Sequence, residues 1–199
     1  MDHDKCVASV RKLLTEMNTI SYIVESMAAM GRSFDATMVK CVRGDTAQGS
    51  RDGGSEAGYL WQDRGPHKKG NIILHENLLG DVNDVERVLR HELIHAFDDT
   101  RAVIEPTNCY HQACSEVRAA RMSGECSWDQ ERKRGYYNPA TSGMACVRRR
   151  AALAVSANPY CRNTEERAVE KVFNTCYRDY EPFVAPLYML GSYPEGEKE

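Results

Sequence analysis

The sequence predicts a single α+β domain with a small sheet in its first half and helices in its second half. Two observations lead to this prediction. Three short segments with strand-like composition lie before residue 80, and segments of helical periodicity dominate after it. The length of 199 residues fits one domain, designated here as residues 1–199. A domain of this size buries roughly 70% of its unfolded surface, so its core needs no staple for stability.

The first half begins with one predicted amphipathic helix over residues 5–30, where apolar residues recur at helical spacing until Gly31. Strands are predicted over residues 36–42, 57–62 and 71–75. They make up a small sheet region, residues 36–80, which also contains a glycine-rich loop. No Gly-Lys-Ser/Thr sequence follows this loop, so it is not a phosphate-binding loop.

The second half opens with a helix that a capping box, Asn83 with Glu86, would start and that Pro106 would follow. A second helix is predicted over residues 107–123, and the two form the region 82–124. A cysteine-rich helical annex, residues 125–180, follows. Its helices are predicted over 128–134, 142–157 and 164–179, the last with its own capping box from Asn163 to Glu166. The tail, residues 181–199, holds three prolines and is predicted to be extended or disordered.

Composition and charge exclude two classes of protein. The net charge of −3 and the pI of about 6.1 provide no basic surface for nucleic acid. No apolar run reaches the length of about 18 residues that spans a bilayer, and the acidic N-terminus resembles neither a secretory signal nor a matrix presequence. We therefore expect a soluble or peripheral protein that does not bind nucleic acid.

The chain has eight cysteines, and none of them forms a Cys-x-x-Cys pair typical of zinc ribbons. They are Cys6, Cys41, Cys109, Cys114, Cys126, Cys146, Cys161 and Cys176. Free, buried thiols in a reducing cytosol are one interpretation. The even number and wide spread favour the other, which is several disulfides in an oxidising compartment. Their connectivity does not follow from the sequence.

His91, Glu92 and His95 are the residues that carry the chemistry. Side chains four residues apart share one face of a helix, so both imidazoles can bind the same zinc ion. Glu92 lies beside them and can take a proton from an activated water molecule. This arrangement is that of a zinc metallopeptidase, with Glu92 as the catalytic base and His91 and His95 as metal ligands.

A catalytic zinc requires a third protein ligand, for which the sequence offers two candidates. Glu116 lies on the next predicted helix and is followed by Ala119 and Ala120, which would allow close helix packing. This layout is that of a gluzincin-like minimal zincin. His111 is the alternative, either as a ligand or as a residue behind the ligands. Asp98 lies one turn beyond His95 and could orient a ligand histidine through its second ring nitrogen.

These residues and their flanks resemble a family of mitochondrial inner-membrane metallopeptidases. The resemblance rests on the zinc motif with its neighbours and on the segments that carry cysteines. The matching segments are 71–74, 89–98, 111–120, 123–126, 146–148, 172–176 and 181–183. It covers most of the chain, and the cysteine-bearing segments are more specific than the zinc motif alone.

The resemblance implies a peripheral location on the intermembrane-space side of the mitochondrial inner membrane. It also implies a substrate, the N-terminal extension of ATP synthase subunit a, and a role in assembly of the ATP synthase membrane sector. The competing function is an assembly chaperone for which proteolysis is dispensable. We further expect an extended substrate to pair with the strand at 71–75. The apolar and aromatic tail residues are candidates for a membrane contact or for packing on the domain, namely Phe183, Leu187, Tyr188, Met189 and Leu190.

Overall fold

A computed structural model describes residues 1–44 and 56–185. Within these residues the chain forms a three-stranded sheet and seven α-helices, which confirms the α+β prediction. The helices are α1 (His3–Glu16), α2 (Asn18–Ala29), α3 (Val82–Arg101), α4 (Cys109–Met122), α5 (Trp128–Lys133), α6 (Met144–Ser156) and α7 (Glu165–Cys176). The strands are β1 (Val39–Val42), β2 (Ala57–Tyr59) and β3 (Ile72–His75). Short 3₁₀ helices lie at Ala36–Met38, Glu76–Leu78 and Pro139–Thr141.

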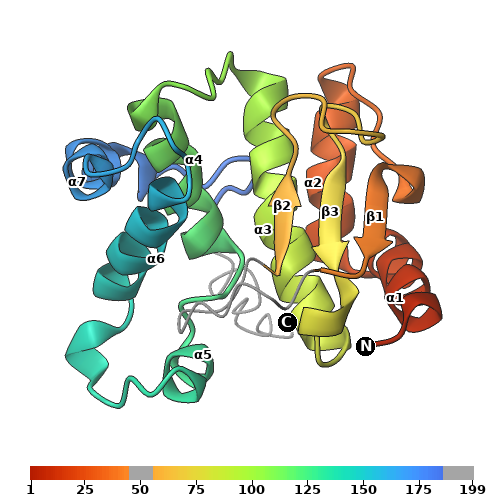
Figure 1. The fold of residues 1–199 in the computed structure, drawn as a ribbon, viewed down its shortest axis with the longest axis horizontal. Helices are drawn as coiled ribbons and strands as arrows, with labels where there is room; N and C mark the ends of the chain where they lie inside the picture. The colour runs from red at the N-terminus through yellow and green to blue at the C-terminus, as the bar shows by residue number, and fades with distance from the viewer. Residues whose placement is uncertain (45–55, 186–199) are drawn as a thin grey trace, which may run out of the picture.

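The sheet has the strand order β1-β3-β2, with β1 parallel and β2 antiparallel to β3. Burial alternates along β3, where Ile72 and Leu74 are fully buried, because successive side chains point to opposite faces. The expectation that a substrate pairs with residues 71–75 is wrong, because β3 is the central strand and both its edges are occupied. In the described part of the chain, β2 is the edge strand on the side of α3 (Figure 1).

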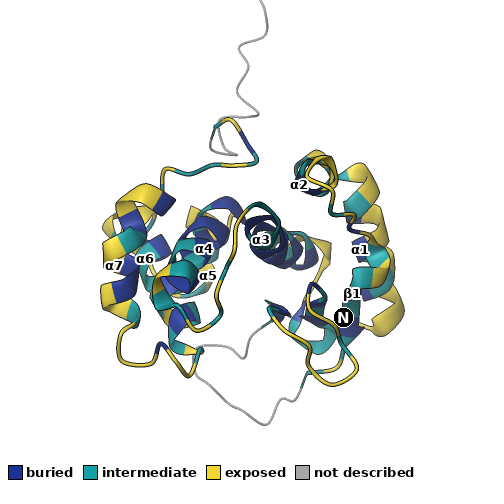
Figure 2. Cartoon of the chain, turned by 90° about the horizontal axis from the view of Figure 1, so that it is seen from above, coloured by how far each residue is buried: buried dark blue, intermediate teal, exposed yellow. Residues whose placement is uncertain are grey.

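Two hydrophobic cores lie on either side of α3 and α4. The first joins α1, α2, the sheet and one face of α3, and it includes Ile20, Leu89 and Ile94. The second joins α4, α6 and α7 around Val117 and Phe173. Seen from above, the two groups of helices form separate lobes, and α3 and α4 lie side by side between them (Figure 2). A side chain that leaves α3 toward α4 therefore enters the junction of the lobes.

Four disulfides link the eight cysteines, which confirms the interpretation that the cysteines are oxidised. The pairs are Cys6–Cys41, Cys109–Cys161, Cys114–Cys176 and Cys126–Cys146. The first ties α1 to β1 in one lobe, and the other three lie in the lobe of α4, α6 and α7. Closing loops of 20 to 62 residues stabilises a fold by about 3–4 kcal/mol per bridge.

The predicted N-terminal helix over residues 5–30 is two helices. Met17 ends α1 and precedes α2, and its backbone is extended, with φ −93° and ψ 104°. Its carbonyl accepts hydrogen bonds from the backbone N–H groups of Ile20 and Ser21, so the second helix starts at once. The apolar residues keep a helical spacing through this break because both helices bury an apolar face in the first core. Gly31 follows α2 with a φ of +89°, as expected of a helix stop.

Both predicted capping boxes are wrong. The cap of α3 is Asp81, whose carboxylate accepts hydrogen bonds from the N–H groups of Asn83 and Asp84, so Asn83 is already helical. At α7 the cap is Thr164, which makes no side-chain capping bond, and Asn163 has a φ of +68° in the preceding turn. Asp and Asn can cap a helix or occupy a turn before it. The spacing of a capping box alone does not distinguish these roles, so it missed Asp81 at α3 and the turn position of Asn163 before α7.

The chain after α7 crosses from one lobe to the other. Phe183 is 7% exposed, and its ring stacks on Tyr22 of α2 with centroids 5.7 Å apart. The packed position of Phe183 excludes it as a membrane contact. The rest of the predicted tail from residue 186, and most of the glycine-rich loop, at 45–55, lie outside the described residues. Among the described helices, none is long and apolar enough to cross a membrane.

Candidate metal centre

The two histidines of the His-Glu-Leu-Ile-His segment project from α3 toward α4. Leu89, Leu93 and Ile94 are fully buried in the first core and fix the rotation of the helix. His91 and His95 are therefore left on the face that meets the other lobe, one turn apart. Their ring centroids are 4.9 Å apart, and their planes make an angle of 77°. Both rings come from one rigid helix, so their spacing is set before any ligand arrives.

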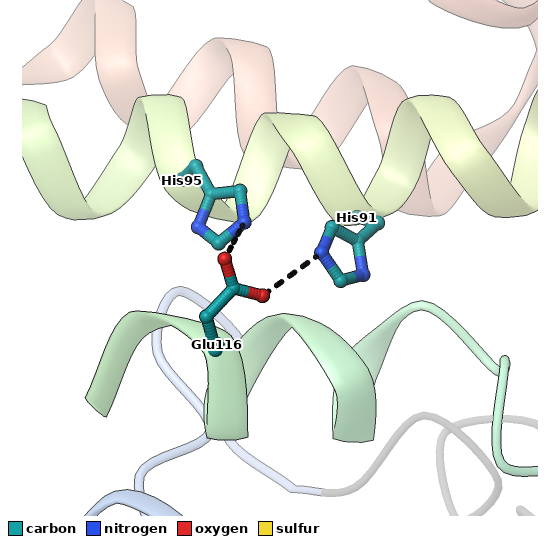
Figure 3. A group of neighbouring side chains, drawn as sticks. All are labelled: His91, His95 and Glu116. Carbon is teal, nitrogen blue, oxygen red and sulfur yellow. Dashed lines mark ion pairs between the residues drawn. The ribbon is translucent and has the colours of Figure 1, made fainter. Parts of the chain in front are cut away.

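Glu116 of α4 completes the group from the opposite side (Figure 3). Its Oε1 lies 3.5 Å from Nε2 of His95, and its Oε2 lies 3.4 Å from Nε2 of His91. Ala119 and Ala120, which follow it, are 0% and 1% exposed and allow the two helices to approach closely. One ligand atom from each of the three residues lies within 4.8 Å of the others, so the group can hold a metal ion.

The donor set fits zinc. Two imidazole nitrogens and one carboxylate oxygen are ligands that zinc accepts, and three protein ligands leave a position open for chemistry. Glu116 Oε2 is buried and satisfies no hydrogen-bond geometry with any described residue, which is costly for a carboxylate without a cation. His111 lies outside this group, at the start of α4, where its Nδ1 accepts a hydrogen bond from the Glu105 N–H. The geometry thus favours Glu116 over His111 as the third donor.

The pKa values of the two histidines shift in opposite directions. Burial lowers the pKa of His95 to about 4. Burial also opposes protonation of His91, but the charges of Glu125, Glu116 and Glu92 outweigh it and raise its pKa to about 9. Burial would raise the pKa of Glu116, yet the two neighbouring imidazoles lower it. Negative charge therefore gathers where the two imidazole nitrogens face Glu116, which favours binding of a cation there.

Glu92 is 6% exposed, and burial raises its pKa to about 7. The backbone N–H of Tyr59, in the edge strand β2, donates a hydrogen bond to its carboxylate. A carboxyl group with a pKa near neutrality can both accept and release a proton at physiological pH. The edge strand thus holds Glu92 beside the two histidines.

Three residues that the sequence did not single out complete the surroundings. The ring of Trp61 lies edge-on to His95, with centroids 5.6 Å apart. Ser115 connects His95 to Asp98: its hydroxyl donates to Asp98 Oδ2 at 2.9 Å and lies 2.8 Å from His95 Nδ1. Asp98 was expected to orient a ligand histidine directly, but the structure places Ser115 between them. The sequence feature that could have identified Ser115 is its position next to Glu116.

Glu125 is the third of these residues and lies behind His91. Its Oε1 is 3.6 Å from His91 Nδ1, and its Oε2 is 3.4 Å from the guanidinium of Arg150. The carboxylate is buried, with 4% exposure of the residue. Each imidazole therefore has a different neighbour on its outer nitrogen, Glu125 for His91 and Ser115 for His95.

Comparisons with known proteins found one family model and several curated relatives. The model of the peptidase M76 family matches residues 4–184. A protein of Schizosaccharomyces pombe, named mitochondrial inner membrane protease atp23, is 34% identical over 92% of this chain and 92% of its own length. The proteins of the same name in Saccharomyces cerevisiae S288c and Debaryomyces hansenii are 42% and 31% identical, over 62% and 89% of this chain. The chain spans 57% and 71% of the lengths of these two relatives. No solved structure matches the chain.

Proposed function

The chain belongs to the peptidase M76 family, and we propose that it is a zinc-dependent metalloendopeptidase of the mitochondrial inner membrane. The observation that carries the proposal is the convergence of His91, His95 and Glu116 from two helices beside the buried Glu92. A minimal, gluzincin-like zincin has this layout, with two histidines on one helix and a carboxylate on the next. We also propose that residues 1–199 form a single metallopeptidase domain, because the site lies where the two lobes meet.

In this mechanism His91, His95 and Glu116 hold the metal. Bound zinc would supply a Lewis acid that polarises the scissile carbonyl and makes water more acidic. Glu92 accepts the proton of the attacking water molecule and delivers it to the departing amine. Its raised pKa, near 7, suits both steps, and the N–H of Tyr59 keeps the carboxylate in place. Ser115 and Asp98 keep the His95 ring turned toward Glu116.

The proposal extends to location and substrate. The names of the relatives place them at the mitochondrial inner membrane, and four disulfides are typical of an oxidising compartment such as the intermembrane space. We assign the protein to that side of the membrane, in peripheral contact with it. The proposed substrate is the N-terminal extension of ATP synthase subunit a, and the proposed second role is assistance in assembly of the ATP synthase membrane sector.

Elemental analysis of purified protein tests the metal site. Wild type should hold about one zinc ion per chain, as a single three-ligand site predicts. Glu116→Ala should lose it, whereas the matched variant His111→Ala, also on α4 but outside the group, should keep it. Loss of zinc only in His111→Ala would move the third ligand to that residue. Folded wild type without zinc would overturn the peptidase proposal.

Cleavage is tested separately with Glu92→Gln, which should keep zinc and the fold but lose proteolysis of the subunit a precursor. The assay uses the subunit a precursor as its substrate, so that loss of proteolysis can be compared directly with assembly of ATP synthase in cells. If cells with Glu92→Gln still assembled ATP synthase, assembly without proteolysis would be the main function, as the chaperone alternative predicts.

A further inference from the structure

Arg118 of α4 is an arginine without exposed surface, and it contacts Asp98 behind the metal site. Its Nε donates to Asp98 Oδ1 and Oδ2 at 3.0 and 3.2 Å. Its Nη1 donates to the Asp179 carbonyl at 2.9 Å and pairs with the Asp179 carboxylate. Its Nη2 donates to the Glu181 carbonyl. All three nitrogens of a buried cation are thus engaged.

Arg101 of α3 joins the same two aspartates from the outer side. Its Nε lies 3.1 Å from Asp98 Oδ1, and its Nη2 lies 2.6 Å from Asp179 Oδ2. Two arginines and two aspartates therefore form a group of linked ion pairs, and the exposed Glu181 carboxylate adds a contact with Arg101 Nη1 at 2.8 Å. Asp179 lies just after α7, more than 60 residues along the chain from Arg118, so the group joins the end of the annex to the zinc-site helices. An arginine shared by two carboxylates is geometrically well defined.

Asp98 connects this group to the metal site. Ser115 has a single hydroxyl proton, and it donates that proton to Asp98 Oδ2. The Ser115 oxygen therefore accepts the hydrogen bond from Nδ1–H of His95. The proton of the imidazole is then on Nδ1, and Nε2, which faces Glu116, keeps its lone pair for a metal.

We propose that Asp179 is a positioning residue for the metal site, because it occupies the two arginines that would otherwise compete with Ser115 for Asp98. This inference rests on the proposed function only in that the site is taken to hold zinc. Without the Asp179 carboxylate, Nη2 of Arg101 loses its partner, and Nη1 of Arg118 keeps only the Asp179 backbone carbonyl. Both guanidinium groups already contact Asp98, and Arg118 Nε reaches the same Oδ2 that accepts the Ser115 proton, so a guanidinium that moves closer to Asp98 competes with Ser115. Ser115 then loses its acceptor and is free to donate to His95 Nδ1, which moves the ring proton to Nε2.

The alternative is a purely mechanical role, in which Asp179 only fastens the segment after α7 to α3 and α4. The two roles predict different observations. A mechanical anchor lowers the free energy of unfolding and leaves the His95 tautomer unchanged. A positioning residue changes the tautomer in the folded protein. Nitrogen-15 NMR of histidine-labelled, zinc-free protein reports the tautomer and requires no metal, so it remains informative even if wild type proves not to bind zinc.

The experiment compares wild type with Asp179→Asn and with Glu170→Gln. Glu170 is the matched control, an acid on α7 that pairs with Arg148 at 3.0 Å far from Asp98. We expect the Nδ1–H tautomer of His95 in wild type and Glu170→Gln, and a mixture or the Nε2–H tautomer in Asp179→Asn. Zinc affinity, measured by chelator competition, should fall about 10-fold in Asp179→Asn alone.

A double variant separates the positioning role from the mechanical role, and it also removes an unpaired cation that could keep Asp179→Asn from folding. Adding Arg101→Gln removes one of the two released cations, so the tautomer and zinc affinity should return toward wild type. A mechanical anchor predicts instead that the two losses add. An unchanged tautomer and zinc affinity in Asp179→Asn, or an Nε2–H tautomer in wild type, would overturn the inference.

Discussion

The indole of Trp61 meets the imidazole of His95 edge-on, with ring centroids 5.6 Å apart and planes at 61°. Trp61 follows the edge strand β2, and the same indole packs against Tyr59, whose N–H holds Glu92. One aromatic residue thus touches the surroundings of both a proposed ligand and the proposed base. Because the protein has two tryptophans, Trp61 and Trp128, it also provides an optical signal from the site.

Zinc binding should change the fluorescence of Trp61. The metal fixes the charge and position of the His95 ring, and an imidazole in contact with an indole affects its emission. We expect a titration with zinc to change the emission of wild type and of Trp128→Phe, because Trp128 lies on α5, outside the site. Trp61→Phe should lose the change while still binding zinc. A signal that persists in Trp61→Phe and disappears in Trp128→Phe would contradict this placement.

Glu125 should strengthen zinc binding through His91. Its carboxylate faces the outer nitrogen of that ring at 3.6 Å and favours a ring orientation with Nε2 toward Glu116. Glu125→Gln should therefore weaken zinc binding about 10-fold. The matched control is Glu131→Gln, another buried acid, which binds Arg134 and Arg149; Arg134 also donates to the Glu125 backbone carbonyl, so the control tests that link while the Glu125 carboxylate stays in place. It should lower stability but leave the zinc affinity unchanged, and equal zinc affinities for both variants would refute the role of Glu125.

Glu92 should make the zinc-free protein less stable as the pH rises. Burial raises its pKa to about 7, so the folded protein keeps this proton at pH values where the unfolded chain has lost it. The stability that results is fully present below the unfolded pKa of about 4.3 and is lost as the pH rises through 7. Glu92→Gln, which resembles the protonated acid, avoids this loss.

Urea unfolding in the presence of a chelator measures the effect. Glu92→Gln should exceed wild type in stability by about 2 kcal/mol at about pH 8, and by much less at about pH 5. Glu131→Gln serves again as the control for loss of a buried acid. A stability difference between Glu92→Gln and wild type that is the same at both pH values would show that the Glu92 carboxyl is not protonated in the folded, metal-free protein.

The part of the site that lies on one helix could be predicted from sequence, because a helix fixes the geometry of residues four apart. This rule alone predicted His91, Glu92 and His95. Glu116, the metal-ligand candidate on the second helix, was predicted from the small residues that follow it. Ser115 and Glu125 could not be predicted in the same way. Their contacts depend on how α4 and the turn after it pack against α3, and spacing along the chain does not contain that information.

The fold shows the same limit. The helical period ran through Met17 because an apolar pattern records burial rather than continuity of the backbone. The capping-box pattern placed the start of α3 at Asn83, whereas Asp81 supplies the capping carboxylate. The number and spread of the cysteines indicated disulfides, but pairing Cys114 with Cys176 requires α4 and α7 to be adjacent. Local rules therefore gave the elements, and tertiary packing decided their ends and their partners.

Removing the bridge between Cys114 and Cys176 should destabilise the annex more than it disturbs the metal site. The bridge closes a loop of 62 residues, and its loss in Cys114→Ala/Cys176→Ala should cost about 4 kcal/mol of unfolding free energy. The shorter loop of Cys126–Cys146, with a separation of 20, should cost about 3 kcal/mol. The Cys114–Cys176 bridge joins α4 to α7, whereas the metal-ligand candidates lie on α3 and α4.

Zinc affinity separates the two bridges. Cys126 is adjacent to Glu125, so Cys126→Ala/Cys146→Ala should weaken zinc binding as well as stability, because the carboxylate behind His91 loses its fixed backbone. Cys114→Ala/Cys176→Ala should lower stability alone, since α3 and α4 still pack through Ala119 and Asp179 is still held by Arg101 and Arg118. Urea unfolding and chelator competition on the same samples give both quantities. Weaker zinc binding in Cys114→Ala/Cys176→Ala than in Cys126→Ala/Cys146→Ala would mean that α7, rather than the turn holding Glu125, controls the geometry of the site.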